Sequence, residues 1–193
     1  SVDAGSMDTG PAARPAPEVP SGAERPYAYL ADWNSFADAQ VLAALLREGI
    51  KLRVATEPFE ADGRPFGRGT LVITRTGNEA LGDRFDTAVR EAAGDHGQTL
   101  HAVASGFVTS GPDFGSSDVV FLDKPAVAVL AGEPLSSYSV GQVWHFFDQQ
   151  LGYPVTLIDP DALGGIDLAG YDVLVLPSGA FSNVLTDERL ADV

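Results

Sequence analysis

Small and hydroxyl-bearing residues follow two apolar segments in the last third of the chain. The first segment spans 126–132, the second spans 171–179, and both have the length and composition of buried β-strands. In doubly wound sheets, ligands sit beyond the carboxyl ends of parallel strands, where the strand order reverses. The sequence therefore predicts a ligand crevice between the ends of these two segments. Its candidate ligand-binding residues are Gly132, Glu133, Ser136, Ser137, Ser178 and Gly179.

A structural role competes with ligand binding for the serines of this stretch. Ser136, Ser137 and Ser139 come just before a predicted helix, where free backbone N–H groups favour an anion. One of these hydroxyls is needed to cap the helix, and serine is among the preferred N-cap residues. The stretch has neither a GxGxxG pattern nor the lysine of a phosphate-binding loop. We expect capping and turn formation here, with ligand contact as the alternative.

The sequence offers no complete set of catalytic or metal-binding residues. It contains no G-x-S-x-G elbow and no cysteine. His145 and Asp148 are three residues apart on a predicted helix, which makes half a zinc site at best. Trp144 and Phe147 belong to the apolar stripe of that helix, so we expect core or interdomain packing, with ligand stacking as the alternative. We predict neither a catalytic residue nor a metal site in this chain.

Charge and composition exclude several kinds of partner. The chain has 193 residues, of which 45% are hydrophobic, and a formal net charge of −15. A surface this acidic repels phosphate backbones, so nucleic acid is not expected as a partner. No apolar run approaches the roughly 20 residues of a membrane-spanning helix, and no membrane insertion is expected.

The pattern of elements divides the chain into three parts. Residues 1–24 are rich in Pro, Gly, Ala and Ser and predict a flexible linker. Residues 25–124 predict a small α/β domain with the order β-α-β-hairpin-α-β, in which Asp62-Gly63 forms the hairpin turn. We predict that this domain closes with a strand at 100–105, followed by a loop of about 20 residues.

Residues 125–193 predict the beginning of a second α/β domain. A strand at 126–132, a helix at 139–151 and two further strands favour a parallel sheet in the order 2-1-3, which begins a flavodoxin-like, doubly wound sheet. A further helix is expected to begin at 186–193 and to be cut short. An incomplete sheet exposes an edge strand, so we expect self-association or coverage of that edge by the linker.

Three spaced motifs carry a resemblance to a known family. They are "PF…GRPFGRGTLVI" (58–73), "SG…GPDFGS" (105–116) and "SSYSVGQVWHFFDQQLGYPVT" (136–156). In this order they resemble the region downstream of the catalytic domain in bacterial zinc carboxypeptidases of the carboxypeptidase A-like metallopeptidase family. The segment from Ala126 also resembles a class I glutamine amidotransferase-like fold.

The resemblance implies a function for the chain but gives it no catalytic residue. No His-x-x-Glu is present, and His145-Phe-Phe-Asp148 departs from that pattern at the acidic position. Zinc is therefore expected only in an upstream peptidase domain, which would also be the partner of this chain. The resemblance implies an extracytoplasmic (periplasmic or secreted) region that acts as an accessory or scaffold or that presents substrate. The alternative is a small-ligand-binding module that uses the 132–137/178–179 crevice for an anionic or sugar-like ligand.

Overall fold

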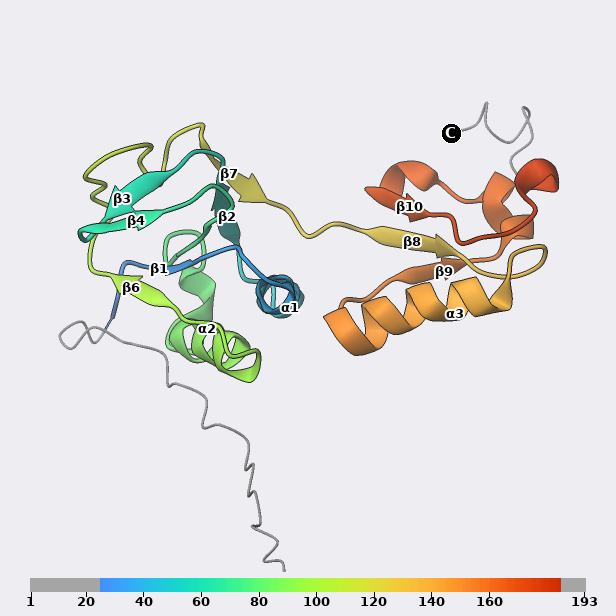
Figure 1. Cartoon of the computed structure of the whole chain (residues 1–193), viewed down its shortest axis with the longest axis horizontal. Helices are drawn as coiled ribbons and strands as arrows, with labels where there is room; N and C mark the ends of the chain where they lie inside the picture. Colours follow the sequence, from blue (N-terminus) through green and yellow to red (C-terminus); the bar gives the residue numbers. More distant parts are fainter. Residues whose placement is uncertain (1–24, 185–193) are drawn as a thin grey trace, which may run out of the picture.

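The computed structural model describes residues 25–184, which form two lobes, each built on its own sheet (Figure 1). A short segment between β7 and β8 connects the N-terminal lobe to the C-terminal lobe. The chain is thus mixed α/β, with an antiparallel sheet first and a parallel sheet second.

The N-terminal lobe carries the larger sheet, whose strand order is β6-β1-β5-β2-β7. Its strands are β1 (Ala28–Ala31), β2 (Leu52–Ala55), β5 (Leu71–Thr74), β6 (His101–Val103) and β7 (Val119–Leu122). The remaining elements are the helices α1 (Phe36–Arg47) and α2 (Arg84–Asp95), the 3-10 turn η1 (Glu79–Leu81), and the hairpin strands β3 (Phe59–Ala61) and β4 (Arg64–Phe66).

The connections of this sheet interleave two βαβ units. Strands β1 and β2 are joined through α1, and β5 lies between them, antiparallel to both. Strands β5 and β6 are joined through α2, and β1 lies between them, again antiparallel to both. This is the split βαβ arrangement of ferredoxin-like domains, with β7 added beside β2.

Each face of the larger sheet is covered, which explains why β1 and β5 are buried along their whole length. Alternate residues of a strand point to opposite faces. Tyr29 and Ile73 join the cluster made with α1 and α2, whereas Leu30 and Val72 join the cluster on the other face. That second cluster contains the hairpin residues Phe59, Ala61 and Phe66 together with Val108 and Phe114 of the long loop.

The predicted hairpin is confirmed, whereas the prediction of a loop of about 20 residues before Lys124 is wrong in its last part. Asp62 (φ 50°) and Gly63 (φ 73°) both adopt the positive φ that a two-residue turn between β3 and β4 requires. The segment expected to remain a loop up to Lys124 instead contains β7, which pairs with β2 along the whole strand. The loop before β7 also bonds to the hairpin, since Glu60 N–H donates to Ser110 O over 2.8 Å.

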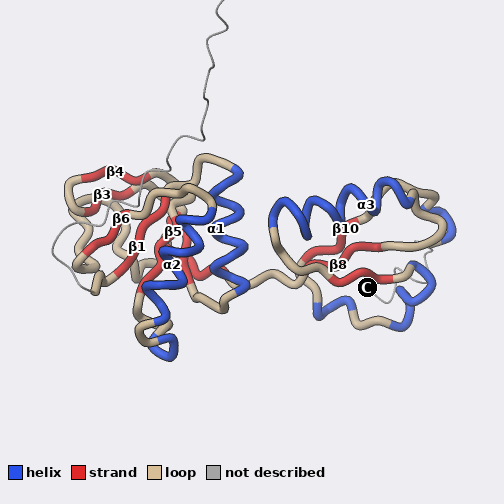
Figure 2. The backbone as a smooth tube through the Cα atoms, turned by 90° about the horizontal axis from the view of Figure 1, so that it is seen from below, coloured by secondary structure: helices blue, strands red, loops and turns tan. Residues whose placement is uncertain are grey.

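The C-terminal lobe is a three-stranded parallel sheet in the order β10-β8-β9, which confirms the predicted order 2-1-3. Its strands are β8 (Val127–Leu130), β9 (Thr156–Ile158) and β10 (Val173–Val175). Helix α3 (Ser137–His145) continues into a π-helical turn, η2 (Phe146–Leu151), and runs along one side of the strands (Figure 2). Short 3-10 turns follow at η3 (Pro160–Gly165), η4 (Leu168–Gly170) and η5 (Phe181–Asn183).

Two expectations for this lobe need correction. The helix begins at Ser137 instead of 139 and loses its α-helical character after His145, although Gly152 ends it in the left-handed region (φ 65°), as predicted. The last strand was expected to be buried, but it is an edge strand, and Val173 is 44% exposed. Among the three described strands of this lobe, the central strand β8 alone is buried throughout.

The two lobes touch where α1 meets the end of the α3–η2 helix (Figure 1). The rings of Phe36 and Phe146 lie 5.9 Å apart, and Arg47 Nη1 donates to Gly152 O over 3.0 Å. Val127 and Tyr153 belong to the same apolar cluster as the core residues of α1. The predicted linker 1–24 and the predicted helix at 186–193 lie outside the described residues.

Candidate functional site

The loops after β8 and β10 meet at the carboxyl edge of the parallel sheet, as the strand order requires. The N–H of Ser136 donates to the carbonyl oxygen of Ser178 over 2.8 Å, and Leu135 forms an isolated antiparallel bridge with Gly179. A Cβ added to Gly179 would lie only 2.5 Å from Leu135 Cδ2. The place where sequence reasoning puts the crevice is therefore occupied by close main-chain contact.

The serine hydroxyls have structural partners in these loops. Ser136 is the N-cap of α3, and its Oγ accepts from Ser139 N over 3.4 Å, which confirms that one of the serines caps the helix. The Oγ of Ser139 accepts from Ser178 N over 3.0 Å and so joins the helix start to the β10 loop. Three of the six predicted residues thus connect the two loops by backbone contacts. They are Ser136, Ser178 and Gly179.

The other three predicted residues line a groove on the opposite side, beside β9. We call this hollow of about 490 Å³ the Trp144 groove. Its lining residues are Gly132, Glu133, Leu135, Ser137, Val140, Gly141, Trp144 and Leu157. The structure thus brings Gly132, Glu133 and Ser137 together with an aromatic ring, and a ligand-binding role for them remains a prediction.

Helical periodicity explains why α3 presents this face to the groove. Ser137, Gly141 and Trp144 stand at positions i, i+4 and i+7, which share one side of a helix. A Cβ added to Gly141 would meet no atom within 4 Å, so the missing side chain leaves open space between the hydroxyl and the indole. No residue of α3 is buried, and Trp144 itself is 43% exposed.

Among the described residues, the one charged side chain in the lining of the groove is a carboxylate. Glu133 is exposed in the lining, and none of the lining residues within the described part of the chain is Lys or Arg. Asp159, which follows β9, lies at the same edge of the sheet. A Cβ built on Gly132 would stand 3.2 Å from Asp159 Oδ2, while Asp159 Oδ1 accepts from Asp161 N over 2.8 Å.

The environment of Trp144 differs from the sequence expectation. Its place in the apolar stripe indicates core packing, and Phe147 and Leu151 of the same stripe do pack against the cluster that contains α1. Trp144 instead lines the groove with Leu157, which is 50% exposed. Periodicity assigns a residue to a helix face but does not show where the strands beneath that face end, so the sequence contains no signal for this exposure.

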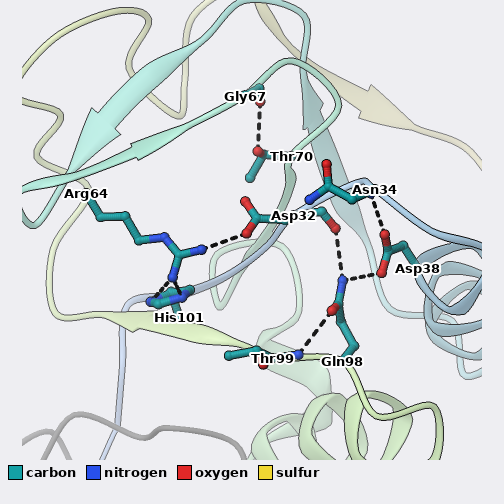
Figure 3. A network of polar contacts seen from close by, with 9 residues as sticks. All are labelled: Asp32, Asn34, Asp38, Arg64, Gly67, Thr70, Gln98, Thr99 and His101. Atoms are coloured by element: carbon teal, nitrogen blue, oxygen red, sulfur yellow. Dashed lines mark hydrogen bonds and ion pairs between the residues drawn. The ribbon is translucent and has the colours of Figure 1, made fainter.

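A second polar constellation lies in the N-terminal lobe, beyond the end of β1 (Figure 3). Arg64 of the hairpin donates to Asp32 Oδ2 over 2.6 Å and also contacts the ring of His101. Gln98 donates to Asp32 O over 2.9 Å and to the buried Asp38. These side chains bond to one another and tie the hairpin, β6 and the start of α1 together, so we assign them a structural role.

The histidines do not combine into a metal site. His101 lies on β6 of one lobe and His145 on α3 of the other. Across residues 25–184, no three His, Cys, Asp or Glu side chains are grouped so that they could hold a metal ion. No helix of that same part is long and apolar enough to cross a membrane.

Comparison with known protein family models, curated proteins and solved structures finds no match to this chain.

Proposed function

We propose that this chain is an accessory, non-catalytic α/β module that binds a small ligand in the Trp144 groove. One observation carries the proposal: the half-exposed indole of Trp144 shares a groove with the carboxylate of Glu133 and the hydroxyl of Ser137. Binding sites for small molecules are mostly apolar hollows of several hundred Å³ with a few polar groups that orient the ligand.

The lining matches that description. Leu135, Val140 and Leu157 supply aliphatic surface, and the indole supplies a flat face on which a ring or a methylated group can rest. The groove also lies at the carboxyl edge of a parallel sheet, where ligands of such sheets are usually found. Among the expected ligands, a sugar-like molecule agrees better with Glu133 than an anion does, since a carboxylate repels like charge.

Melting of the full chain in the presence of separate probes tests the proposal. Glucose, inorganic phosphate and choline represent a neutral sugar, an anion and an organic cation. We expect at least one of them to raise Tm, because binding to the folded state alone stabilises it. Failure of all three to change Tm at millimolar concentration would contradict the proposal.

Two substitutions at one position locate the binding event. Gly141→Leu places a side chain in the open space between Ser137 and Trp144 and should abolish the shift. Gly141→Ala adds one methyl group that meets no neighbour within 4 Å and should leave most of the shift intact. A ligand shift that survives Gly141→Leu would place binding elsewhere.

A scaffold role is the second candidate function. It is favoured by the hydrogen bonds between the loops after β8 and β10 at the predicted crevice. The bonds from Ser136 N to Ser178 O and from Ser178 N to Ser139 Oγ give that edge a rigid structure without a ligand. By resemblance, this scaffold would support an upstream zinc carboxypeptidase-like domain outside the cytoplasm and present substrate to it. Zinc titration with a peptidase assay on this chain tests the non-catalytic part, and stoichiometric tight zinc or peptide cleavage would refute it.

The same proposal includes a finer description of the C-terminal lobe. We propose that its sheet is the first half of a flavodoxin-like, class I glutamine amidotransferase-like sheet. The parallel order β10-β8-β9, with β8 central, supports this description. If residues follow Val193 in the parent protein, a chain that includes them should cover β10 and slow the hydrogen exchange of the β10 amides. Unchanged exchange would count against the description.

A further inference from the structure

We infer that the ligand of the Trp144 groove is an organic cation, specifically a methylated ammonium group. This inference rests on the proposed function and narrows its ligand class. It follows from the residues that line the groove: the carboxylate of Glu133, one tryptophan and aliphatic side chains.

The charges at the groove all favour a cation. Glu133 lines it, and Asp159 Oδ2 approaches Gly132, so two carboxylates stand at the ends of β8 and β9. The lining residues within the described range include no Lys or Arg that would neutralise them. The chain as a whole carries a net charge of −15, which adds a weaker attraction of the same sign.

The start of α3 is the one feature that would favour an anion. A helix N-terminus acts as roughly half of a positive elementary charge. Here Ser136 Oγ already accepts from one of the first free amides, that of Ser139. The full negative charge of Glu133, which lines the groove, exceeds this remaining partial charge, so the net field in the groove attracts cations.

The aromatic and aliphatic surface selects the kind of cation. The face of a tryptophan ring is the best aromatic partner for an ammonium group, and quaternary ammonium ligands are recognised in this way. Leu135 and Leu157 would contact methyl groups, whereas a small inorganic ion would gain nothing from them. A sugar could accept from and donate to the few polar groups here, but its neutral hydroxyl groups gain less from the Glu133 charge than an ammonium group does.

Calorimetric titration of the full chain with choline and with 3,3-dimethylbutan-1-ol tests the inference. The two probes have nearly the same shape, but the second carries no charge. We expect choline to bind at least about tenfold more tightly, because only the cation gains from the carboxylates and the indole. Raising the salt concentration should weaken choline binding and leave the neutral probe unaffected.

Substitutions distinguish a specific site from general attraction to an acidic protein. Glu133→Gln should weaken choline several-fold without changing the neutral probe, and Gly141→Leu should abolish both. Glu91→Gln removes one exposed carboxylate on α2, in the other lobe, and should leave the affinity for choline unchanged. Choline binding that responds equally to Glu133→Gln and Glu91→Gln would overturn the inference.

The outcomes separate the inference from the proposed function. If glucose or the neutral alcohol binds as tightly as choline and Gly141→Leu abolishes that binding, the groove is a ligand site but its ligand is not a cation. If no probe binds, or if binding is indifferent to Gly141→Leu, the proposed function fails as well. Circular dichroism of each variant verifies that a loss of binding is not a loss of folding.

Discussion

The backbone N–H of Ser136 donates a 2.8 Å hydrogen bond to the carbonyl oxygen of Ser178, and this contact joins the loops that follow β8 and β10. Ser136 follows β8 and Ser178 follows β10, at the point where the strand order of the parallel sheet reverses. Their contact occupies the usual crevice of such a sheet, and the hollow appears instead on the other side of β8, beside Leu157 and Trp144.

Enlarging Gly179 should separate the two loops. An added Cβ would lie 2.5 Å from Leu135 Cδ2 and 2.7 Å from Leu135 Cα, so Gly179→Ala requires the backbone to move. We expect a loss of about 1–3 kcal/mol in the free energy of unfolding, measured by chemical denaturation. Gly164→Ala is the matched control, because its Cβ would meet no atom within 4 Å. Equal stability of the two variants would show that the loop contact is not tight.

Filling the backbone space of Gly141 should stabilise α3. Glycine inside a helix costs up to about 1 kcal/mol relative to alanine, and the alanine methyl group would meet no neighbour here. Gly141→Ala should therefore raise the free energy of unfolding by about 0.5–1 kcal/mol and increase Tm. A fall in Tm would mean that the space above Gly141 is closed in solution.

Asp86 should make the N-terminal lobe sensitive to acid. Arg75 donates to its carboxylate over 2.7 Å, and Tyr29 donates over 2.8 Å. Partial burial acts to raise the pKa of Asp86, but these bonds and the positive charges outweigh it and hold the pKa below its usual value. Because the folded pKa is depressed, this stabilisation is present above the unfolded pKa of about 3.9 and is lost as pH falls through the folded pKa.

Replacing Asp86 by Asn measures that contribution. The variant should be less stable than the parent at pH 7, and the difference should shrink as pH falls below about 4. Denaturant unfolding at a series of pH values provides the measurement. A difference independent of pH would show that Asp86 contributes by packing alone.

Tyr29 should make the same lobe sensitive to alkali. Its hydroxyl is buried and donates to Asp86, and both features disfavour the phenolate, which raises the pKa of Tyr29 to about 12. Since the folded pKa is raised, stability is unaffected below the unfolded pKa of about 10 and falls as pH rises from there towards 12. Tyr29→Phe should flatten this decline in denaturant unfolding between pH 9 and pH 12 relative to the parent, and an unchanged slope would contradict the assignment.

The features predicted correctly are those that short-range chemistry or chain handedness determines. Asp62-Gly63 predicts its hairpin because both residues tolerate positive φ. The order of β8, β9 and β10 follows from the handedness of parallel crossovers. Strand β7 was missed because it pairs with β2, far away in sequence, after a long loop that carries no periodic signal. The interleaving of β1 and β5 is likewise a non-local pairing that local patterns do not contain.

The site could be predicted only in part for a similar reason. The pattern of a buried strand followed by a turn predicts Gly132, Glu133 and Ser137 at the carboxyl edge of the sheet, where they line the Trp144 groove. The close approach of Leu135 to Gly179 determines which side of β8 is open. These two residues are more than 40 positions apart in the sequence, so local patterns do not predict their contact. Trp144 lines the groove because the edge strand β9 next to it is exposed. No pattern in the sequence indicates that exposure.

The two indole N–H signals of the chain provide the most direct test that the Trp144 groove binds a ligand. The chain has two tryptophans, so the indole of Trp33 in the other lobe is an internal control within the same sample. Choline added to ¹⁵N-labelled protein should shift the Trp144 indole signal along a saturable curve and leave that of Trp33 in place. Shifts that are equal for both indoles and do not saturate, or no shift of either, would contradict the account.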